Sequence, residues 1–360
     1  MKDQDRTFEP AIPSHLEVPR SRAKRMSEGY EPPHATFAAR FRPSVLKVVM
    51  GYFGVQYRGA ETPRVVAALD HLTKSFYLPS GPRHWDRARY VDEAQYTNII
   101  SVAYWDSPDL FRAWLETPSN REWWESEARA SEDIGYFREI YIPGIEDYET
   151  AFSAKTPEGI ANLAPSMSGE IREHGYWGSA RDRIPLSQVA ALEASGWLTA
   201  DVSQGTLGKR IKVEAHENLC LIRSGQDWGD ASEEDRRVYF EDLEPHLAAG
   251  MLFLRDKGKP IGCYANRFVR SIDKTGQQLD KTFCISLWRG LKDLERWAEF
   301  HPTHLAIFGA AIKYFEKVGS NTWLRVYHEV TVVRKQDQSF EYVNCHGQTG
   351  LLPSVSAVGN

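Results

Sequence analysis

Runs of hydrophobic residues with alternating and helical spacing recur along the chain in an order that repeats once. The first half contains strand-like runs at 45–58, 96–105 and 135–142 and helix-like runs at 63–77 and 108–116. The second half contains strand-like runs at 217–224, 281–290 and 323–330 and helix-like runs at 232–256 and 291–300. Each half is therefore predicted to have the order β-α-β-α-β, with an insertion before the last strand of the second half.

The spacing of tryptophans supports a duplication. Trp105 ends a predicted strand, and Trp114 lies nine residues later on the following helix. Trp288 and Trp297 repeat this spacing in the second half, and the last strands also match, YFREI against VYHEV. The pattern favours two ferredoxin-like α+β modules that combine their sheets. The alternative is chance recurrence of aromatic-rich strand–helix units.

The predicted elements divide the chain into five segments. They are an extended N-terminal arm (1–44), a first ferredoxin-like half (45–150), a connecting segment (151–210), a second ferredoxin-like half (211–350) and a tail (351–360). The arm is rich in proline, which is typical of a disordered tail or of an arm that wraps a neighbouring subunit. The connecting segment is richer in glycine, serine and other polar residues.

Two histidines in the last quarter lie on faces that are otherwise apolar. His304 begins a predicted helix. The apolar positions on its face are Ile307, Phe308, Ala311, Ile312 and Phe315. Thr303 is the expected N-cap of this helix, and His301 lies off the apolar stripe, which makes it the weaker ligand candidate. His328 lies in a predicted strand. The same strand face carries Leu324, Val326, Val330 and Val332.

Buried imidazoles need partners, because an unpaired polar group in an apolar setting costs roughly 1–3 kcal/mol. One hypothesis is that a haem lies between the two histidines. The small residues at 309–311 would let a flat macrocycle approach the helix backbone. The alternative is that each histidine is an ordinary core residue with a satisfied hydrogen bond, which is the common case for a single buried histidine.

Composition narrows the range of functions. The chain has 360 residues and a formal net charge of −5, so it lacks the basic surface of a nucleic-acid-binding protein. Its four cysteines are far apart, without a C-x-x-C or C-x-x-C-H motif, which disfavours a zinc ribbon and covalently attached haem. No run of about 18 apolar residues is present, and the first residues lack the apolar core of a signal peptide. We therefore expect a cytoplasmic protein with reduced thiols and no membrane partner.

Four short segments, taken in order, carry a family resemblance. They are HGYWGSARDR, LIRSGQDW, HPTHL and LRVYHEV. Together they resemble the aldoxime dehydratases, and the likeness extends over about residues 28–350. The resemblance implies a haem b enzyme that converts aldoximes to nitriles with loss of water. It also implies a homodimer and an α+β fold, in which duplicated ferredoxin-like halves form a β-barrel-like core flanked by helices, related to the chlorite dismutase and dye-decolourising peroxidase group.

The same resemblance implies roles for five residues. His304, the second histidine of HPTHL, matches the haem ligand, and His328 in LRVYHEV matches the distal catalytic histidine. Ser224 in LIRSGQDW matches the serine that binds the substrate hydroxyl, and Arg183 in HGYWGSARDR matches the catalytic arginine. Glu149 falls where the family has an acidic residue that assists the distal site, although the flanking match is looser.

The proposed reaction suits these residue types. In R–CH=N–OH the N–O bond must break, and the leaving oxygen needs a proton. Ferrous iron with an open sixth position would hold the oxime through its nitrogen. A free imidazole has a pKa of about 6.5, so it can act first as general acid and then as base. An arginine is always charged, so Arg183 is expected to act by electrostatics and hydrogen bonding.

Less specific interpretations stay open. Ser224 precedes Gly225 and could end its strand and cap a turn. Residues 181–183 could form a surface loop with a local ion pair. Three other functions are compatible with the sequence: a haem peroxidase on a related fold, a haem carrier or gas sensor, and a haem-free barrel whose histidines are structural.

Overall fold

The computed structural model describes residues 7–319 and 322–356. Residues 1–6 of the predicted arm and residues 357–360 of the predicted tail lie outside these ranges. No helix within the described ranges is both long enough and apolar enough to cross a bilayer.

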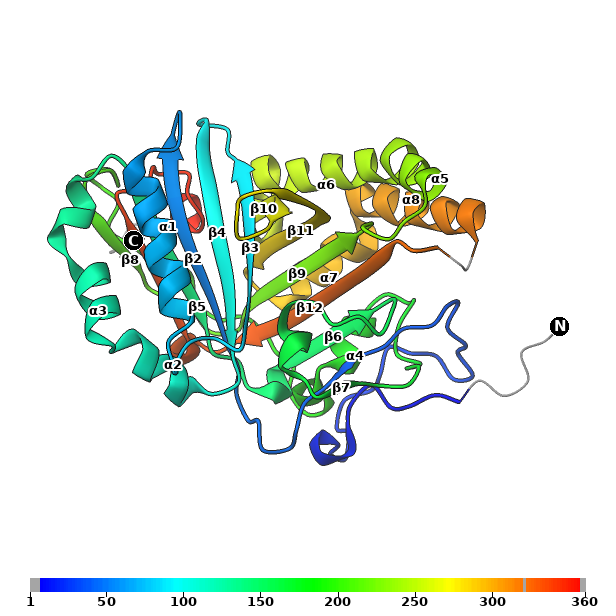
Figure 1. The fold of residues 1–360 in the computed structure, drawn as a ribbon. Coiled ribbons are helices and arrows are strands. Elements are labelled where there is room, and N and C mark those ends of the chain that lie inside the picture. The colour runs from blue at the N-terminus through cyan, green and yellow to red at the C-terminus, as the bar shows by residue number, and fades with distance from the viewer. Residues whose placement is uncertain (1–6, 320–321, 357–360) are drawn as a thin grey trace.

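Within the described residues, one antiparallel sheet of eleven strands dominates the molecule (Figure 1). The first half contributes β2 (Val49–Arg58), β3 (His84–Val91), β4 (Tyr96–Trp105) and β5 (Gly135–Tyr141). The second half contributes β9 (Leu219–Asp227), β10 (Cys263–Ile272), β11 (Gln278–Trp288) and β12 (Arg325–Val333). The strand orders are β5-β2-β4-β3 and β12-β9-β11-β10, so the two halves have the same topology. They join where β10 pairs with β3.

Shorter strands extend the sheet at both ends. β6 (Tyr148–Phe152) pairs with β12, while β13 (Gln338–Val343) pairs with β5 and with β8 (Arg210–Val213). A separate two-stranded sheet joins β1 (Ala39–Arg40) to β7 (Ser166–Met167). β6 is important for the site described below, because it lies beside the strand that carries His328.

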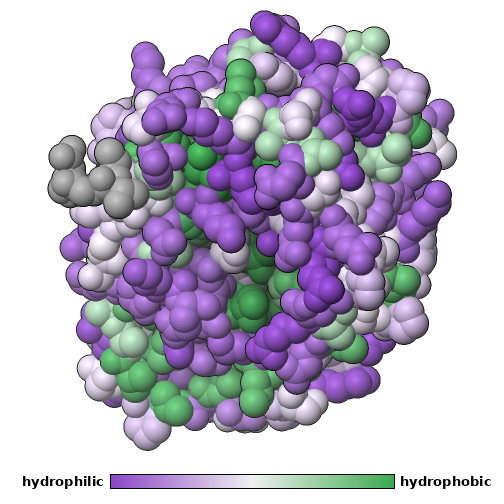
Figure 2. Space-filling view, turned by 90° about the vertical axis from the view of Figure 1, so that its left-hand side faces the viewer, coloured by the Kyte–Doolittle hydropathy of each residue, from purple (hydrophilic) through white to green (hydrophobic). Residues whose placement is uncertain are grey.

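Helices cover the outer face of each half (Figure 1). The first half has α1 (Pro63–Phe76), α2 (Pro108–Leu115) and α3 (Pro118–Glu125). The second half has α5 (Glu233–Val238), α6 (Glu244–Lys257), α7 (Leu291–Phe300) and α8 (Pro302–Val318), and a π-helical turn at Tyr239–Leu243 joins α5 to α6. The short α4 (Ser179–Arg183) lies in the connecting segment. On the side of the first half the surface is mainly hydrophilic, with small apolar patches (Figure 2).

The predicted duplication is confirmed, but each half has one more strand than the pattern predicted. β3 and β10 make the order β-α-β-β-α-β, which is the ferredoxin-like order. The pattern of hydrophobic runs did not predict these two strands, because they carry arginines and other polar residues in place of an apolar run. Arg87 on β3 and Arg267 on β10 are nonetheless buried, and Arg267 pairs with the buried Glu139 at 2.5–2.7 Å.

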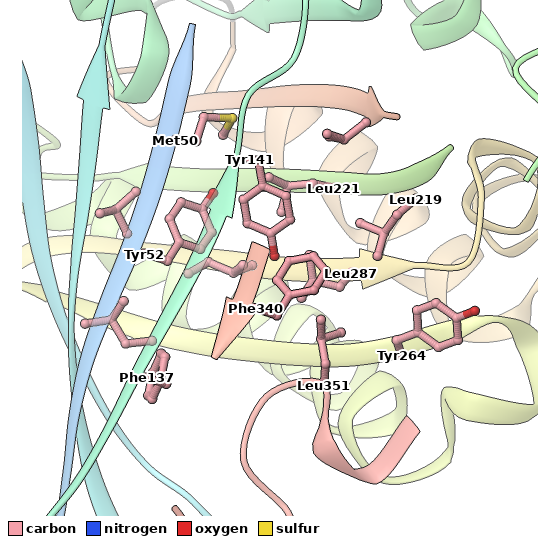
Figure 3. Close-up of a cluster of buried hydrophobic side chains, with 14 of the residues drawn as sticks. Met50, Tyr52, Phe137, Tyr141, Leu219, Leu221, Tyr264, Leu287, Phe340 and Leu351 are labelled. Atoms are coloured by element: carbon pink, nitrogen blue, oxygen red, sulfur yellow. The ribbon is translucent and has the colours of Figure 1, made fainter. Parts of the chain in front are cut away.

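The sheet curls so that the inner faces of the two halves pack together. One buried cluster contains Tyr52 and Tyr141 from the first half with Leu221 and Leu287 from the second, and Phe340 on β13 joins them (Figure 3). This packing forms the predicted barrel-like core. It also leaves the opposite, outer face of each half to its own helices, and the two halves use that face differently.

The described part of the N-terminal arm is packed rather than free. Glu9 forms a bridge with Ile171, Phe37 forms one with Phe152, and β1 pairs with β7. The interpretation of the arm as a disordered tail is therefore wrong for residues 7–44. The arm lies along the connecting segment of its own chain.

Candidate active site

A cavity of about 320 Å³ lies between the outer face of the second half and its helices. Residues of β9, β11 and β12 form one wall, and α6, α7 and α8 form the other. The lining is mostly aliphatic and aromatic. It includes Leu247, Met251, Ile307, Phe308, Phe315 and Val326. A mainly apolar cavity of this size with a few polar groups is typical of small-molecule sites, which span about 300–1,000 Å³.

His304 lines this cavity from the first turn of α8. Its Nδ1 lies 2.7 Å from the Ala298 carbonyl, which can only accept, so Nδ1 carries the proton and Nε2 is available as a metal ligand. Burial lowers the pKa of His304, against an opposing effect of the Ala298 carbonyl, so the ring is neutral at pH 7. The rings of Trp297 and Trp177 meet it edge to face, with centroids 4.7 and 5.7 Å away.

The start of α8 differs from its prediction. The N-cap is His301, whose Nδ1 accepts from the Thr303 N–H at 3.3 Å, so Thr303 already lies inside the helix. The His301 ring packs on Phe253, outside the cavity lining. Of the small residues at 309–311, Ala311 lines the cavity, whereas Ala310 packs into a buried cluster with Tyr314.

His328 and Ser224 line the opposite wall of the same cavity. They are direct partners in the antiparallel ladder between β12 and β9. Ser224 lies inside β9, which continues to Asp227, so the interpretation of Ser224 as a strand-end residue is wrong. Gly225 does not end the strand. A Cβ there would lie 2.3 Å from the ring of Tyr327, so the missing side chain makes room for that ring.

Glu149 and Arg183 converge on His328. Glu149 lies on β6, which pairs with β12, and Arg183 lies at the end of α4. Arg183 Nε donates to Glu149 Oε2 at 2.7 Å, and its Nη2 lies 2.8 Å from His328 Nε2. Glu149 Oε1 lies 3.1 Å from the same Nε2. Arg183 and Glu149 are both buried, so this ion pair is not the surface loop contact considered from the sequence.

The imidazole of His328 therefore meets a donor and an acceptor at one nitrogen. An arginine can only donate, so its hydrogen bond requires Nε2 without a proton, whereas the negative charge of Glu149 favours the protonated ring. The two contacts therefore favour different protonation states of the ring. Burial raises the pKa of Glu149, but the charges of Arg183 and His328 outweigh this effect and hold the pKa below its ordinary value.

The residues of the cavity fit a haem. Within residues 7–319 and 322–356, no group of three or more His, Cys, Asp or Glu side chains could hold a metal ion. A metal here would need most of its ligands from a macrocycle and one from the protein, as in haem with a single axial histidine. His304 offers a neutral, oriented imidazole for that role, and the apolar walls suit a porphyrin.

Comparison with known proteins agrees with this geometry. The family model described as haem-containing dehydratase matches residues 51–351. The chain belongs to this family. The haem and the aldoxime dehydratase resemblance read from four sequence segments are thereby confirmed.

Relatives of this haem-containing dehydratase match over nearly their whole length. The aliphatic aldoxime dehydratase of Pseudomonas chlororaphis is 45% identical over 348 residues, covering 96% of this chain and 98% of the relative. The phenylacetaldoxime dehydratase of Bacillus sp. (strain OxB-1) is 34% identical, covering 92% and 94%. A crystal structure of an aldoxime dehydratase in complex with butyraldoxime has a TM-score of 0.93 and 42% identity, with 98% of each chain covered.

The structure brings all five sequence-predicted residues to one cavity or its edge, and it adds residues that the sequence did not single out. Trp177 contacts both His304 and Phe308, with ring centroids 5.7 and 4.9 Å away. The Glu173 carbonyl accepts from Arg183 Nη1 at 2.6 Å. Both residues lie in or beside the segment HGYWGSARDR. A tryptophan in a polar, glycine-containing segment was the one signal for the first, whereas nothing in the sequence marks a backbone carbonyl.

Replacing Glu149 with glutamine should make the unfolding free energy depend less on pH below about pH 6. The folded-state pKa of Glu149 lies below its ordinary value of about 4.5, so the ionised carboxylate stabilises the fold above that pH. This stabilisation is lost as the pH falls toward the folded-state pKa. Between about pH 6 and about pH 3.5, the wild-type protein should lose more unfolding free energy than Glu149→Gln does. Urea unfolding at matched haem content measures both losses, and equal losses would contradict the assigned charge on Glu149.

Proposed function

We propose that this protein is a haem b lyase that dehydrates aldoximes to nitriles and water. The observation that carries the proposal is the cavity itself, with His304 on one wall and Ser224 and His328 on the other. The relatives described above are all named aldoxime dehydratases, which supports the substrate class. Ferrous haem, when bound, supplies a metal centre that holds the oxime nitrogen and weakens the N–O bond.

His304 is the residue that would hold the iron, through Nε2. Its Nδ1 bond to Ala298 fixes the tautomer and the orientation of the ring, as is usual for metal-binding histidines. His328 lies on the opposite wall, with Arg183 Nη2 and Glu149 Oε1 at 2.8 and 3.1 Å from its Nε2. We therefore assign His328 to proton transfer and not to metal binding.

His328 moves one proton in each direction through its imidazole ring. It first gives a proton to the oxime hydroxyl, so that the N–O bond breaks and water leaves. The neutral ring then takes the proton from the aldehydic carbon as the C≡N bond forms. The enzyme returns to its starting state, and R–CH=N–OH becomes R–C≡N and H₂O. A positioned general acid or base contributes about 10²–10⁴-fold to such a step.

Arg183 and Glu149 give each state of His328 a partner. When the ring is protonated, the Glu149 carboxylate, with Oε1 3.1 Å from Nε2, stabilises its positive charge. When Nε2 carries no proton, Arg183 Nη2 at 2.8 Å can donate to it. The buried ion pair of Arg183 and Glu149 thus holds this edge of the ring in one orientation.

Ser224 and the apolar walls complete the site. The Ser224 hydroxyl lies beside His328 in the ladder and would bind the oxime hydroxyl, which aims the leaving oxygen at His328. The aliphatic and aromatic lining excludes water and strengthens these polar contacts. The relatives with 43–45% identity are named aliphatic aldoxime dehydratases, which supports a preference for alkyl over aryl aldoximes.

We further infer that the enzyme is a cytoplasmic homodimer, as the family resemblance implies. The four cysteines, all free and buried, suit a reducing compartment. The dimer rests on the resemblance alone.

The first test is the absorption spectrum of the anaerobically reduced protein before and after addition of butyraldoxime. A Soret band that shifts with the oxime, followed by butyronitrile in the vial, is the expected result. A Soret band whose position does not change when butyraldoxime is added would favour a peroxidase or a haem carrier. The absence of a Soret band after haem is supplied would show that the protein does not bind haem and that His304 and His328 have structural roles.

His304→Ala should abolish haem binding, because it removes the sole assigned protein ligand. His301→Ala is the matched control, since His301 lies three residues earlier and faces away from the cavity. We expect the control to keep its haem, measured as the ratio of Soret to protein absorbance. A normal haem content in purified His304→Ala would show that the ligand assignment is wrong.

His328→Ala should keep haem and lose turnover by about 10²–10⁴-fold, because the proton donor is gone. Ser224→Ala should keep haem, with kcat/KM lower by about threefold to tenfold, the effect of one lost hydrogen bond. Both variants are measured by nitrile formation at matched haem content. Wild-type kinetics in Ser224→Ala would show that Ser224 does not bind the substrate hydroxyl.

A further inference from the structure

The N-terminal arm reaches the residues on both sides of Arg183. Asp182 directly precedes it, and Glu173 supplies the carbonyl that accepts from its Nη1. The carboxylates of Asp182 and Glu173 are both held by the arm, residues 7–44. Nothing in the proposed reaction uses either carboxylate, yet Asp182 is only 2% exposed and Glu173 only 7%.

Asp182 is bound mainly by backbone of the arm. Its carboxylate accepts from the Arg25 N–H at 2.9 Å and from the Met26 N–H at 3.1 Å, and the Tyr176 hydroxyl donates at 2.8 Å. Arg20 Nη2 also donates to the Asp182 carbonyl at 3.2 Å. A buried carboxylate requires such donors, because leaving it unpaired carries a large desolvation penalty. The arm therefore supplies two of the three donors that make this buried position of Asp182 possible.

Glu173 is held in the same way on the other side. Lys24 Nζ donates to Glu173 Oε1 at 2.7 Å, and the Ala11 N–H donates to Oε2 at 3.2 Å. Because the carbonyl of this residue accepts from Arg183, a shift of Glu173 would move one of the three anchors of the guanidinium. The arm thus contacts both flanks of Arg183 through residues that are far away in sequence.

The segment that carries Arg183 needs tertiary contacts to keep its conformation. α4 has five residues, which is too short for a helix to be stable without tertiary contacts. It follows Gly178, which has φ of +88°, and a Cβ there would lie 2.6 Å from the side chain of Arg25. The glycine therefore permits both the left-handed turn before α4 and the close approach of the arm.

We propose that the N-terminal arm positions Arg183 for the reaction, acting through Asp182 and Glu173. This inference rests on the proposed function, in which Arg183 donates to His328. Asp182 and Glu173 are positioning residues, since neither lines the cavity. Loosening the arm would let the guanidinium drift from His328, whereas His304 keeps its Nδ1 bond to Ala298, which does not involve the arm. The defect would therefore appear in kcat and not in haem binding.

The test is Asp182→Asn in the full-length holoenzyme. Asparagine keeps the shape of the side chain and can keep an oxygen at the Oδ2 position, but it removes the negative charge that strengthens the bonds from the arm. It also puts an NH₂ group where Oδ1 accepts from the Arg25 N–H at 3.2 Å. We expect kcat to fall by about 10-fold to 100-fold with KM and the Soret spectrum unchanged, the size of effect that follows from slight misplacement of a catalytic group. In an Arg183→Ala background, Asp182→Asn should lower kcat by less than about twofold, because coupled residues are not additive.

Ser168→Ala is the matched control. The Ser168 hydroxyl accepts from the Ala38 N–H at 2.8 Å, so it also pins the arm, but at β7 and away from Arg183. Its kcat should stay within about twofold of wild type. An equal fall in kcat in Ser168→Ala and Asp182→Asn, or full additivity of Asp182→Asn with Arg183→Ala, would overturn the proposal.

Hydrogen exchange and a second variant, Lys24→Ala, test the same contacts independently. Hydrogen exchange of residues 176–185 should become faster in Asp182→Asn and stay unchanged in Ser168→Ala. This readout needs no turnover, so it tests the arm even if the wild-type protein forms no nitrile, in which case the proposed function itself fails. If Asp182→Asn does not fold, Lys24→Ala removes a partly exposed ion pair and should lower kcat by about twofold to fivefold. Wild-type kcat in Lys24→Ala together with unchanged exchange would overturn the proposal.

Discussion

The register of β12 is the constraint on which the site depends. Side chains alternate along a strand, so a slip of one residue would turn His328 from the cavity to the inner core. In the observed register His328 faces Ser224 on β9 and lies beside β6, where Glu149 is located. Every distal contact follows from this one alignment. Arg183 alone among the assigned distal residues comes from outside the sheet.

The reverse face of β12 explains why the register is so well specified. Glu329 and Arg223, the neighbours of His328 and Ser224, are partners in the same ladder and lie buried on the inner face. The Tyr104 hydroxyl donates to Glu329 at 2.7 Å and accepts from Arg223 at 2.6 Å, and Arg223 also pairs with Asp86. Burial raises the pKa of Glu329 against the opposing charge of Arg223. Breaking such a buried network typically costs about 3–5 kcal/mol, so the first half fixes the strands that carry the site.

The sequence could predict the parts of this structure that depend on local periodicity. The spacing of Trp105 and Trp114, repeated by Trp288 and Trp297, revealed the duplication. The alternation of β12 put His328 on an otherwise apolar strand face, and the structure shows that this face lines the cavity beneath the helices. β3 and β10 were missed because their buried arginines have partners that only the fold brings near, Thr73 for Arg87 and Glu139 for Arg267. The contact of Arg183 with Glu149 and His328 spans 34 and 145 residues. No pattern in the sequence encodes such convergence, so the family resemblance had to supply it.

The duplication also shows what distinguishes a site from a core. In the first half, Phe53 on β2 pairs with Arg138 on β5, as Ser224 pairs with His328 in the second. The Phe53 ring packs against Trp114, with centroids 5.2 Å apart, and leaves a cavity of about 110 Å³ between sheet and helices, against about 320 Å³ in the second half. Burying such a ring contributes about 1.5–3 kcal/mol, which a serine at the equivalent position gives up, together with the packing lost around a cavity. A ligand that binds only the folded state returns stability by mass action, so a bound haem would do for the second half what the aromatic cluster does for the first.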